Sequence, residues 1–297
     1  MKRERWIGYA FIAPWLAGFL VLTAGPMLYS LYLSFTQASL LSAPRWVGLD
    51  NYAAILTEDP LVPIALANTA YFTLLSVPLG IALSLGLALV LDARVRGIGL
   101  FRTVFFLPSV TNTVAMSVLW LWIFNPEFGL LNMVLSAIGI TGPLWLQSET
   151  WAKPALILMS LWSVGGQMII FLAALQGVPR ELHEAAALDG AGPVRAFRSI
   201  TLPMISPAIL FNTIIGMIGA FQVFTQAYVM TGGVQPGSEG APNNATLFFV
   251  LYLYKKAFQE FRMGYASALA WVLFVILIVL TLVVWRWSLK RVHYEGA

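Results

Sequence analysis

The sequence predicts an all-α integral membrane protein that crosses the bilayer with six transmembrane helices. Of its 297 residues, 59% are hydrophobic and 10% are charged, whereas about a quarter of the residues of a soluble domain are charged. Apolar segments of roughly 20 residues, the length needed to span a bilayer, recur along the chain. The charged residues gather between these segments, and this alternation indicates repeated crossing of a membrane.

The first apolar segment is interpreted as a membrane span that is retained. Basic residues near the amino terminus precede an uncharged run from Trp6 to Pro44. This run is too long for a signal peptide and offers no small-residue cleavage site. We place the span at residues 11–35 and expect Pro14 and Pro26 to kink it.

Five more segments have the length and composition of spans. The third is expected to break near Pro108, and the connection 36–67 is expected to be a polar loop. The piece 130–140 is predicted to be a short amphipathic helix, and 246–261 to be helical but too charged to cross a bilayer. The remaining spans are predicted at residues 68–91, 104–124, 154–175, 208–230 and 264–285.

The distribution of basic residues predicts the orientation. Six spans place both chain ends on the same side, and twelve of the 17 Lys and Arg residues fall on that side. By the positive-inside rule, both termini and the segment 179–207 are cytoplasmic. The twelve are Lys2, Arg3, Arg5, Arg94, Arg96, Arg102, Arg180, Arg195, Arg198, Arg286, Lys290 and Arg291; the other five are Arg45, Lys153, Lys255, Lys256 and Arg262.

Several kinds of chemistry are disfavoured by what the sequence lacks. The cores of the predicted spans contain no Asp, Glu, Lys, Arg or His, groups that proton- and ion-coupled carriers usually keep there. The only histidines are His183 and His293, and there is no cysteine, metal-spaced cluster or nucleophilic triad. No lysine follows a glycine, so there is no P-loop for ATP. We therefore expect neither an enzyme nor a self-powered secondary transporter, and no cofactor or metal bound by this chain.

The segment 179–207 is a charged, helix-forming stretch between two apolar spans. Its opening proline suits the first position of a helix, and Gly190 suits the left-handed position that follows a helix end. Pro193 is then expected to begin a second helix, which Pro203 and Pro207 end. Periodicity alone leaves two interpretations open: a helix pair lying on lipid headgroups, and a surface on which another protein docks.

The residues of this segment resemble the EAA loop of the membrane subunits of binding-protein-dependent ABC importers. The resemblance rests on Glu184-Ala185-Ala186, then Asp189-Gly190, then nine residues, then Ile200-Thr201-Leu202-Pro203. In that family the first short helix is the coupling helix, which seats in a cleft of the ATPase subunit. The resemblance thus implies an ATPase interface comprising Glu181, Glu184, Ala185, Ala186, Asp189, Gly190, Ala191 and Arg195.

Two further stretches resemble the carbohydrate-uptake branch of the family, which includes maltose, multiple-sugar and glycerol-3-phosphate permeases. They run from Trp46 to Tyr52 and from Phe261 to Ala266. The resemblance covers nearly the whole chain and implies a type I ABC importer permease fold, with residues 1–297 forming a single permease domain. The connection 36–67 lacks the large external insertion of the enteric maltose subunit, so that protein's oligosaccharide specificity is not carried over.

Family membership also implies an assembly and a mechanism. The expected partners are a second homologous permease subunit, two ABC ATPase subunits that bind ATP and Mg, an extracytoplasmic solute-binding protein and the lipid bilayer, with no nucleic acid. The expected location is the inner membrane of a prokaryotic cell, and the expected mechanism is alternating access. A different class stays open: a non-transporting membrane scaffold or receptor that docks a cytoplasmic partner on the same segment.

Uncharged polar groups at membrane depth are candidates for the path of a solute. Amides and hydroxyls can satisfy the OH groups of a sugar or polyol, although any one of them is more readily explained as a hydrogen bond between helices. We expect Asn112, Gln222 and Gln226 to line the path, and Gln167 to be a weaker candidate that braces neighbouring helices. The polar groups at this depth are Thr111, Asn112, Thr113, Gln167, Asn212, Gln222, Gln226 and Tyr228. From these we take six as candidate path residues, namely Thr111, Asn112, Gln167, Gln222, Gln226 and Tyr228.

Overall fold

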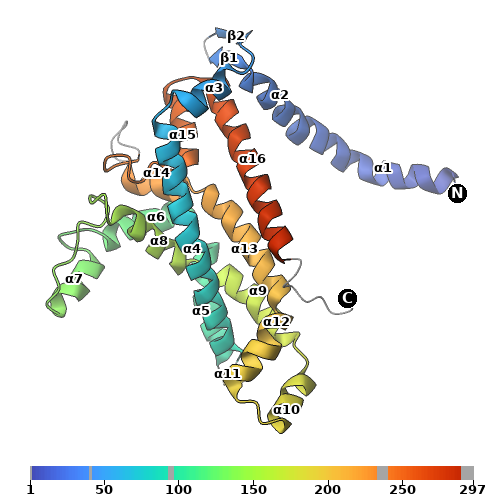
Figure 1. Ribbon diagram of the computed structural model, residues 1–297, viewed down its shortest axis with the longest axis vertical. Coiled ribbons are helices and arrows are strands. Elements are labelled where there is room, and N and C mark those ends of the chain that lie inside the picture. Colours follow the sequence, from blue (N-terminus) through green and yellow to red (C-terminus); the bar gives the residue numbers. More distant parts are fainter. Residues whose placement is uncertain (1, 40–41, 93–96, 233–239, 289–297) are drawn as a thin grey trace. The chain divides into compact units, whose positions relative to one another are not determined.

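A computed structural model describes residues 2–39, 42–92, 97–232 and 240–288 (Figure 1). The described chain is almost wholly helical and forms two compact units. Unit 1 combines Met1–Val62 with Tyr252–Ile276, and unit 2 combines Pro63–Leu251 with Leu277–Ala297. That residues 1–297 make a single domain stays a prediction.

Unit 1 begins with a long helix that changes its hydrogen-bonding pattern once. Helix α1 (Lys2–Phe19) contains Pro14 and continues through the π-helical turn η1 (Leu20–Ala24) into α2 (Gly25–Ser34). Pro26 has no N–H to donate to the preceding turn, and the backbone N–H of Gly25 donates instead to the carbonyl of Leu20, which widens that turn. The helix therefore responds to Pro26 with a π turn, η1, which ends at Ala24.

The connection 36–67 contains more regular structure than the expected polar loop. Strands β1 (Thr36–Ser39) and β2 (Ser42–Trp46) pair antiparallel, helix α3 (Asp50–Thr57) follows, and α4 begins at Leu61. Asn51 Nδ2 donates to the carbonyls of Ser34 and Thr36, each at 2.9 Å. The amide therefore ties α3 to the end of α2, which gives the stretch from Trp46 to Tyr52 a structural role.

A polar network in unit 1 centres on Asp59. Its carboxylate accepts hydrogen bonds from the hydroxyls of Tyr252 and Tyr265 and from the backbone N–H of Leu61. Partial burial alone would raise the pKa of the Asp59 carboxyl, but these hydrogen bonds and the nearby Lys256 ammonium hold its pKa below the usual value. Burial, followed by the bond to Asp59, raises the pKa of the Tyr252 hydroxyl. The network joins the segment before α4 to the segment before the last helix.

The segment 246–261 is helical over most of its length, as expected. Helix α15 (Phe249–Tyr254) continues into the π turn η3 (Lys255–Gln259), where buried Lys256 pairs with Glu260 at 2.8 Å. Helix α16 (Met263–Ser288) follows. A Cβ on Gly264, at the start of α16, would lie 3.0 Å from the backbone nitrogen of Ala38, so glycine permits the close approach of α16 to β1.

Unit 2 consists of helices that are mostly broken or bent. After α4 (Leu61–Leu91) come α5 (Ile98–Val110), α6 (Thr113–Ile123) and the short α7 (Leu130–Ala137). Next are α8 (Ala152–Trp162), α9 (Gly165–Gln176) and α10 (Arg180–Leu188). The remaining elements are α11 (Pro193–Ala196), the π turn η2 (Phe197–Thr201), α12 (Leu202–Met204), α13 (Ser206–Phe221) and α14 (Thr225–Thr231).

The described helices can supply up to six membrane crossings. Three have the necessary length and composition alone, namely Phe11–Ser34, Leu61–Leu91 and Met263–Ser288. Three bent pairs can each supply one more: α5 with α6 at 100°, α8 with α9 at 48°, and Pro193–Met204 with α13 at 64°. The all-helical membrane fold class expected from the sequence is confirmed.

Two predicted spans differ from the structure in where they break. The third does not break at Pro108, which lies inside α5; it breaks after Val110, where Thr111 is extended and Asn112 caps α6. Pro108 lies two residues before the end of α5 at Val110, so the break falls near the proline, as expected, but beyond it. The fifth span, expected to be continuous over 208–230, is interrupted between α13 and α14 at Gln222–Phe224. No proline or glycine marks this second break in the sequence.

A buried apolar cluster organises the end of unit 2 near α10. It joins the end of α4 to α9 and to the junction of α12 and α13, and the members are Ala88, Leu91, Met168, Phe171, Leu172, Leu175 and Ile205. Helices α5 and α9 also pack closely at Gly165, where an added Cβ would lie 2.8 Å from the Cα of Phe106. Together these contacts fix α9, which leads directly into the segment 179–207.

Adjacent glycines allow a test of this packing. Gly165→Ala forces the new methyl group against the backbone of α5 and should lower stability by about 1–3 kcal/mol, the usual effect of overpacking. The measurement is thermal unfolding of the purified protein in detergent. Gly166→Ala is the matched control because a Cβ there meets nothing within 4 Å. Equal unfolding temperatures for the two variants would show that the close approach is absent.

Candidate functional site

The segment 179–207 forms the two-helix arrangement expected from its sequence. Helix α10 ends at Leu188, and Gly190 takes the predicted left-handed conformation, with φ of +75°. Two details differ: Pro179 is the N-cap of α10 and not its first residue, and the second helix runs through Pro203 to Met204. Pro203 follows the π turn η2, in which the N–H of Leu202 donates to the carbonyl of Phe197, and the helix ends one residue later at Met204, before Pro207.

Helix α10 has one face turned to the protein and one turned outward. His183 and Ala186 are half-buried, whereas Glu184, Ala185 and Asp189 are exposed. The exposed residues also include Leu188, whose exposed fraction is 90%. Of the other predicted interface residues, Glu181, Gly190 and Arg195 are exposed and Ala191 is half-buried.

The outward face of α10 carries both charge and apolar surface. Within the described residues, Glu184 makes no ion pair, although Arg180 is placed one turn before it. An apolar side chain as exposed as Leu188, on an otherwise charged loop, gains free energy when a partner covers it. The face is therefore suited to docking on a cleft that combines apolar and basic groups.

A cavity of about 300 Å³ lies among the predicted membrane spans of unit 2, between α4, the junction of α8 and α9, and the junction of α13 and α14. Gln167 and Gln226 both line it, together with the hydroxyl-bearing residues Ser76, Ser160 and Ser163. None of the residues that line this cavity carries a charge.

The amide of Gln167 lies where helices α4 and α13 leave space for it. A Cβ on Gly80 of α4 would lie 3.5 Å from Gln167 Oε1, and a Cβ on Gly216 of α13 would lie 3.5 Å from Gln167 Nε2. Both are ordinary van der Waals distances, so the amide packs between the two helices. Gln167 Oε1 is buried and has no hydrogen-bond partner in the described structure, so it is available to accept from a hydroxyl group.

The structure brings only two of the six candidate path residues together. Thr111 and Asn112 are exposed at the bend between α5 and α6, where Asn112 Oδ1 accepts from the backbone N–H of Val114 at 2.9 Å. Gln222 is exposed at the end of α13, and half-buried Tyr228 stacks on Phe224. The role of these residues in a solute path stays a prediction.

Sequence reasoning did not single out the serines of the cavity. A serine in an apolar helix usually donates to a carbonyl of its own helix, as Ser160 does to Ile157 at 2.7 Å. Gly80 and Gly216 flank the amide of Gln167, but an added Cβ at either would meet it only at 3.5 Å, an ordinary van der Waals distance, so the glycines would not have revealed the cavity either.

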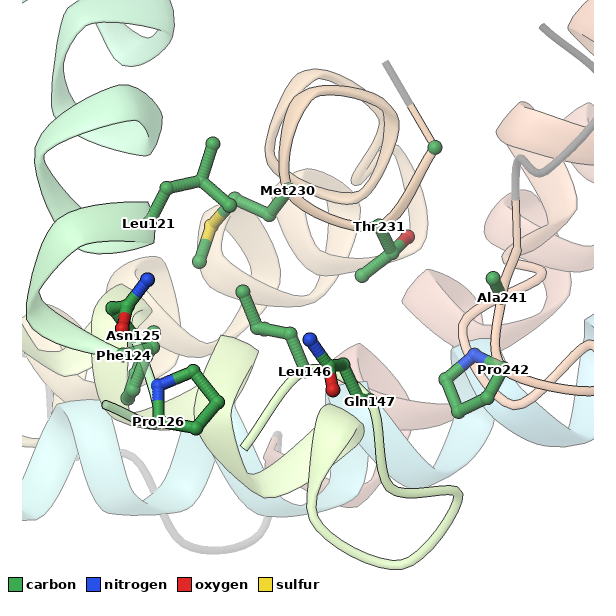
Figure 2. A pocket seen from close by; sticks show the side chains of 11 residues that line it. Leu121, Phe124, Asn125, Pro126, Leu146, Gln147, Met230, Thr231, Ala241 and Pro242 are labelled. Carbon is green, nitrogen blue, oxygen red and sulfur yellow. The ribbon is translucent and has the colours of Figure 1, made fainter. Parts of the chain in front are cut away.

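A second cavity, of about 440 Å³, lies beyond the ends of α6 and α14. Figure 2 shows that Asn125, Gln147 and Thr231 are its polar side chains, among apolar ones such as Leu121 and Met230. Because α13 starts next to the segment 179–207 and α14 continues it, this cavity lies at the opposite end of unit 2 from α10 (Figure 1).

No cluster of His, Cys, Asp or Glu suited to a metal ion occurs in the described parts of the chain.

Comparison with known proteins gives consistent matches. Residues 76–292 match the family described as "Binding-protein-dependent transport system inner membrane component". The probable ABC transporter permease protein YesP of Bacillus subtilis is 42% identical, covering 100% of this chain and 94% of that protein. The lactose transport system permease protein LacF of Rhizobium radiobacter is 38% identical, and the match covers 92% of this chain and 91% of that protein.

A solved structure matches over almost the same length. It is the bacterial alginate ABC transporter in complex with an alginate pentasaccharide-bound periplasmic protein, with a TM-score of 0.82, 25% sequence identity, and coverage of 96% of this chain and 95% of that chain.

Proposed function

The chain belongs to the family of inner membrane components of binding-protein-dependent transport systems, and on that premise we propose that it is a permease subunit of an ATP-driven importer of a sugar or polyol. The observation that carries the proposal is the exposed helix α10, which presents Glu184 and Leu188 outward on a loop with the residues of an EAA motif. The chain is a transport component. We assign ATP and Mg binding, and ATP hydrolysis, to a partner ATPase docked on α10.

The proposed solute is supported by the relatives and by the cavity. LacF is named for lactose transport, and the matched solved structure is named for alginate. The membrane-depth cavity offers amides and hydroxyls without charge, which suits a solute that is rich in hydroxyl groups. The volume of this cavity is at the lower limit for small-molecule sites, about 300 Å³, so a sugar would occupy it within a path completed by the second permease subunit.

The remaining candidate path residues fit the same proposal. Thr111, Asn112 and Gln222 are exposed in this chain, and a second permease subunit would cover exposed surface at membrane depth. We therefore retain them, with Tyr228, as residues of the path on the side that faces that subunit.

The proposed orientation follows the basic residues. It places α10 and both termini in the cytoplasm of a prokaryotic cell and the second cavity on the extracytoplasmic side, where a solute-binding protein would dock. Of the residues used for the orientation, Arg94, Arg96, Lys290 and Arg291 lie outside the described residues.

The docking face can be tested by two substitutions on α10. Glu184→Lys should weaken ATPase binding by roughly an order of magnitude or more, because a lost charge-assisted contact costs about 1.5–3 kcal/mol. Leu188→Asp should weaken it to a similar extent, because burying a leucine side chain contributes about 1.5–3 kcal/mol. The measurements are ATPase co-purification and uptake in vesicles. Glu149→Lys makes the same charge change at an exposed residue that lies on the other side of the membrane in the proposed orientation, and it should leave ATPase co-purification at the wild-type level. Wild-type coupling in both α10 variants would refute the assignment.

The cavity can be tested by removing its amides. Gln167→Leu and Gln226→Leu should reduce sugar uptake while the complex still assembles and hydrolyses ATP. Each substitution removes an amide that would bond to the sugar, and a sugar hydroxyl left without a partner costs about 1–3 kcal/mol. Uptake and ATPase activity are measured on the same preparation. The control is Asn212→Leu, since that buried amide donates to Ala208 of its own helix and does not line the cavity. Normal uptake by both glutamine variants would place the path elsewhere.

The absence of cysteine makes the orientation directly testable. A single cysteine at position 148, in Ser148→Cys, should react with an impermeant thiol reagent added outside intact cells. Ser199→Cys, in the loop that carries α10, should react only after the cells are opened. The reverse pattern of labelling would overturn the orientation.

A further inference from the structure

A third cavity, of about 440 Å³, lies on the inner side of α10. Its walls come from the end of α4, the start of α5, the end of α9 and the first two turns of α10. These elements meet at one end of unit 2 (Figure 1). The side chains that line it include Asp92, Arg102, Gln176, Val178, Arg180 and His183.

The cavity holds more cationic than anionic groups in its described walls. Arg102 is half-buried and oriented by the carbonyl of Leu91, to which Nε donates at 3.2 Å and Nη2 at 2.8 Å. Nη1 of this guanidinium remains for a further partner. Arg180 makes no ion pair among the described residues, and Asp92 pairs with neither arginine.

His183 adds a hydrogen-bond donor to this cavity. It is half-buried, whereas both of its neighbours along α10, Leu182 and Glu184, are exposed. It therefore lies on the face of α10 that is turned away from the proposed ATPase. Its imidazole can donate a hydrogen bond in either protonation state, and the carboxamide of Gln176 adds another donor to the same wall.

We propose that this cavity binds a phosphate group, carried by an anionic phospholipid headgroup or by a free phosphate. The planar guanidinium fork matches the oxygens of a phosphate, and two such groups with an imidazole and an amide supply donors on several sides. The position at the ends of membrane helices is where basic pockets meet lipid headgroups. Leu175 and Val178 give the wall an apolar part, which suits the glycerol and upper acyl region of a lipid.

Asp92 limits which headgroups fit. Its carboxylate repels a second anionic group but accepts hydrogen bonds from hydroxyls. A headgroup with one phosphate and a hydroxylated alcohol, such as phosphatidylglycerol, satisfies both sets of side chains. Bound there, the phosphate would connect Arg180 and His183 of α10 to Arg102 of α5, and so brace α10 against the membrane helices.

The test uses the complete transporter complex in nanodiscs of phosphatidylcholine containing phosphatidylglycerol. Native mass spectrometry measures the phosphatidylglycerol that stays bound to wild type, Arg180→Gln and His183→Gln. Arg180→Gln should reduce retention roughly five- to tenfold, since it removes about one basic contact near the membrane surface. His183→Gln keeps an N–H donor but loses the position of the imidazole, so it should reduce retention by less. Arg286→Gln is the matched control, because Arg286 is an exposed arginine in the last turn of α16, and it should retain lipid as wild type does.

A second arm identifies the source of the phosphate. Complexes in phosphatidylcholine alone are titrated with labelled inorganic phosphate. Lipid retention that depends on Arg180, without phosphate binding, supports the lipid headgroup; phosphate binding that is lost in Arg180→Gln supports a free phosphate. Arg180→Lys keeps the charge but not the fork and should recover only part of the binding. If Arg180→Gln and His183→Gln match Arg286→Gln in both arms, the proposal is wrong, whatever the transport activity.

Discussion

Within the hydrocarbon of a bilayer, every backbone N–H and C=O group must find its partner inside the protein. Breaks within predicted spans interrupt the helical hydrogen bonding of unit 2. Two of them are Ser163–Val164, between α8 and α9, and Gln222–Phe224, between α13 and α14. Ser163, Val164 and Val223 line the same cavity. Two of the breaks therefore border one space, where neighbouring side chains can satisfy the backbone groups.

Helix α9 connects this space to the segment 179–207. It runs for 12 residues, from Gly165 beside the cavity to Gln176 just before α10, a length of about 18 Å. Gly165 holds one end against α5, and Leu175 anchors the other in the cluster that contains Leu91 and Ile205. A rigid helix held in this way would carry a displacement of α10 to Gln167, two residues from its cavity end, by small sliding of packed helices.

The sequence was sufficient where a local pattern decides the structure. Apolar segments of span length predicted the membrane helices, and Gly190 was identified as left-handed because it follows a helix-forming run. Pro108 was misleading: a proline marks a disturbance, but the break came at Thr111 and Asn112, where the amide of Asn112 caps the next helix. The hairpin of β1 and β2 was also missed, since its four- and five-residue strands have little alternation of polarity.

The candidate site was harder to predict because it depends on how bent helices are rotated. The sequence favours Asn112 over Gln167 as a residue of the solute path. In the structure, however, Gln167 lines the cavity and Asn112 caps a helix end. Helix rotation is set by tertiary contacts, here the approach of Gly80 and Gly216 to the amide. Composition revealed that polar groups occur at membrane depth, but only the packing shows which of them share a space.

The polarity of that space also limits what can occupy it favourably. Gln167 Oε1 is buried and accepts no hydrogen bond from a protein group in the described structure, so under the proposed function a solute hydroxyl can donate to it. An ion, by contrast, would find no counter-charge among the residues that line the cavity. The amide and the missing counter-charge would therefore both favour neutral, hydroxyl-rich solutes over ions.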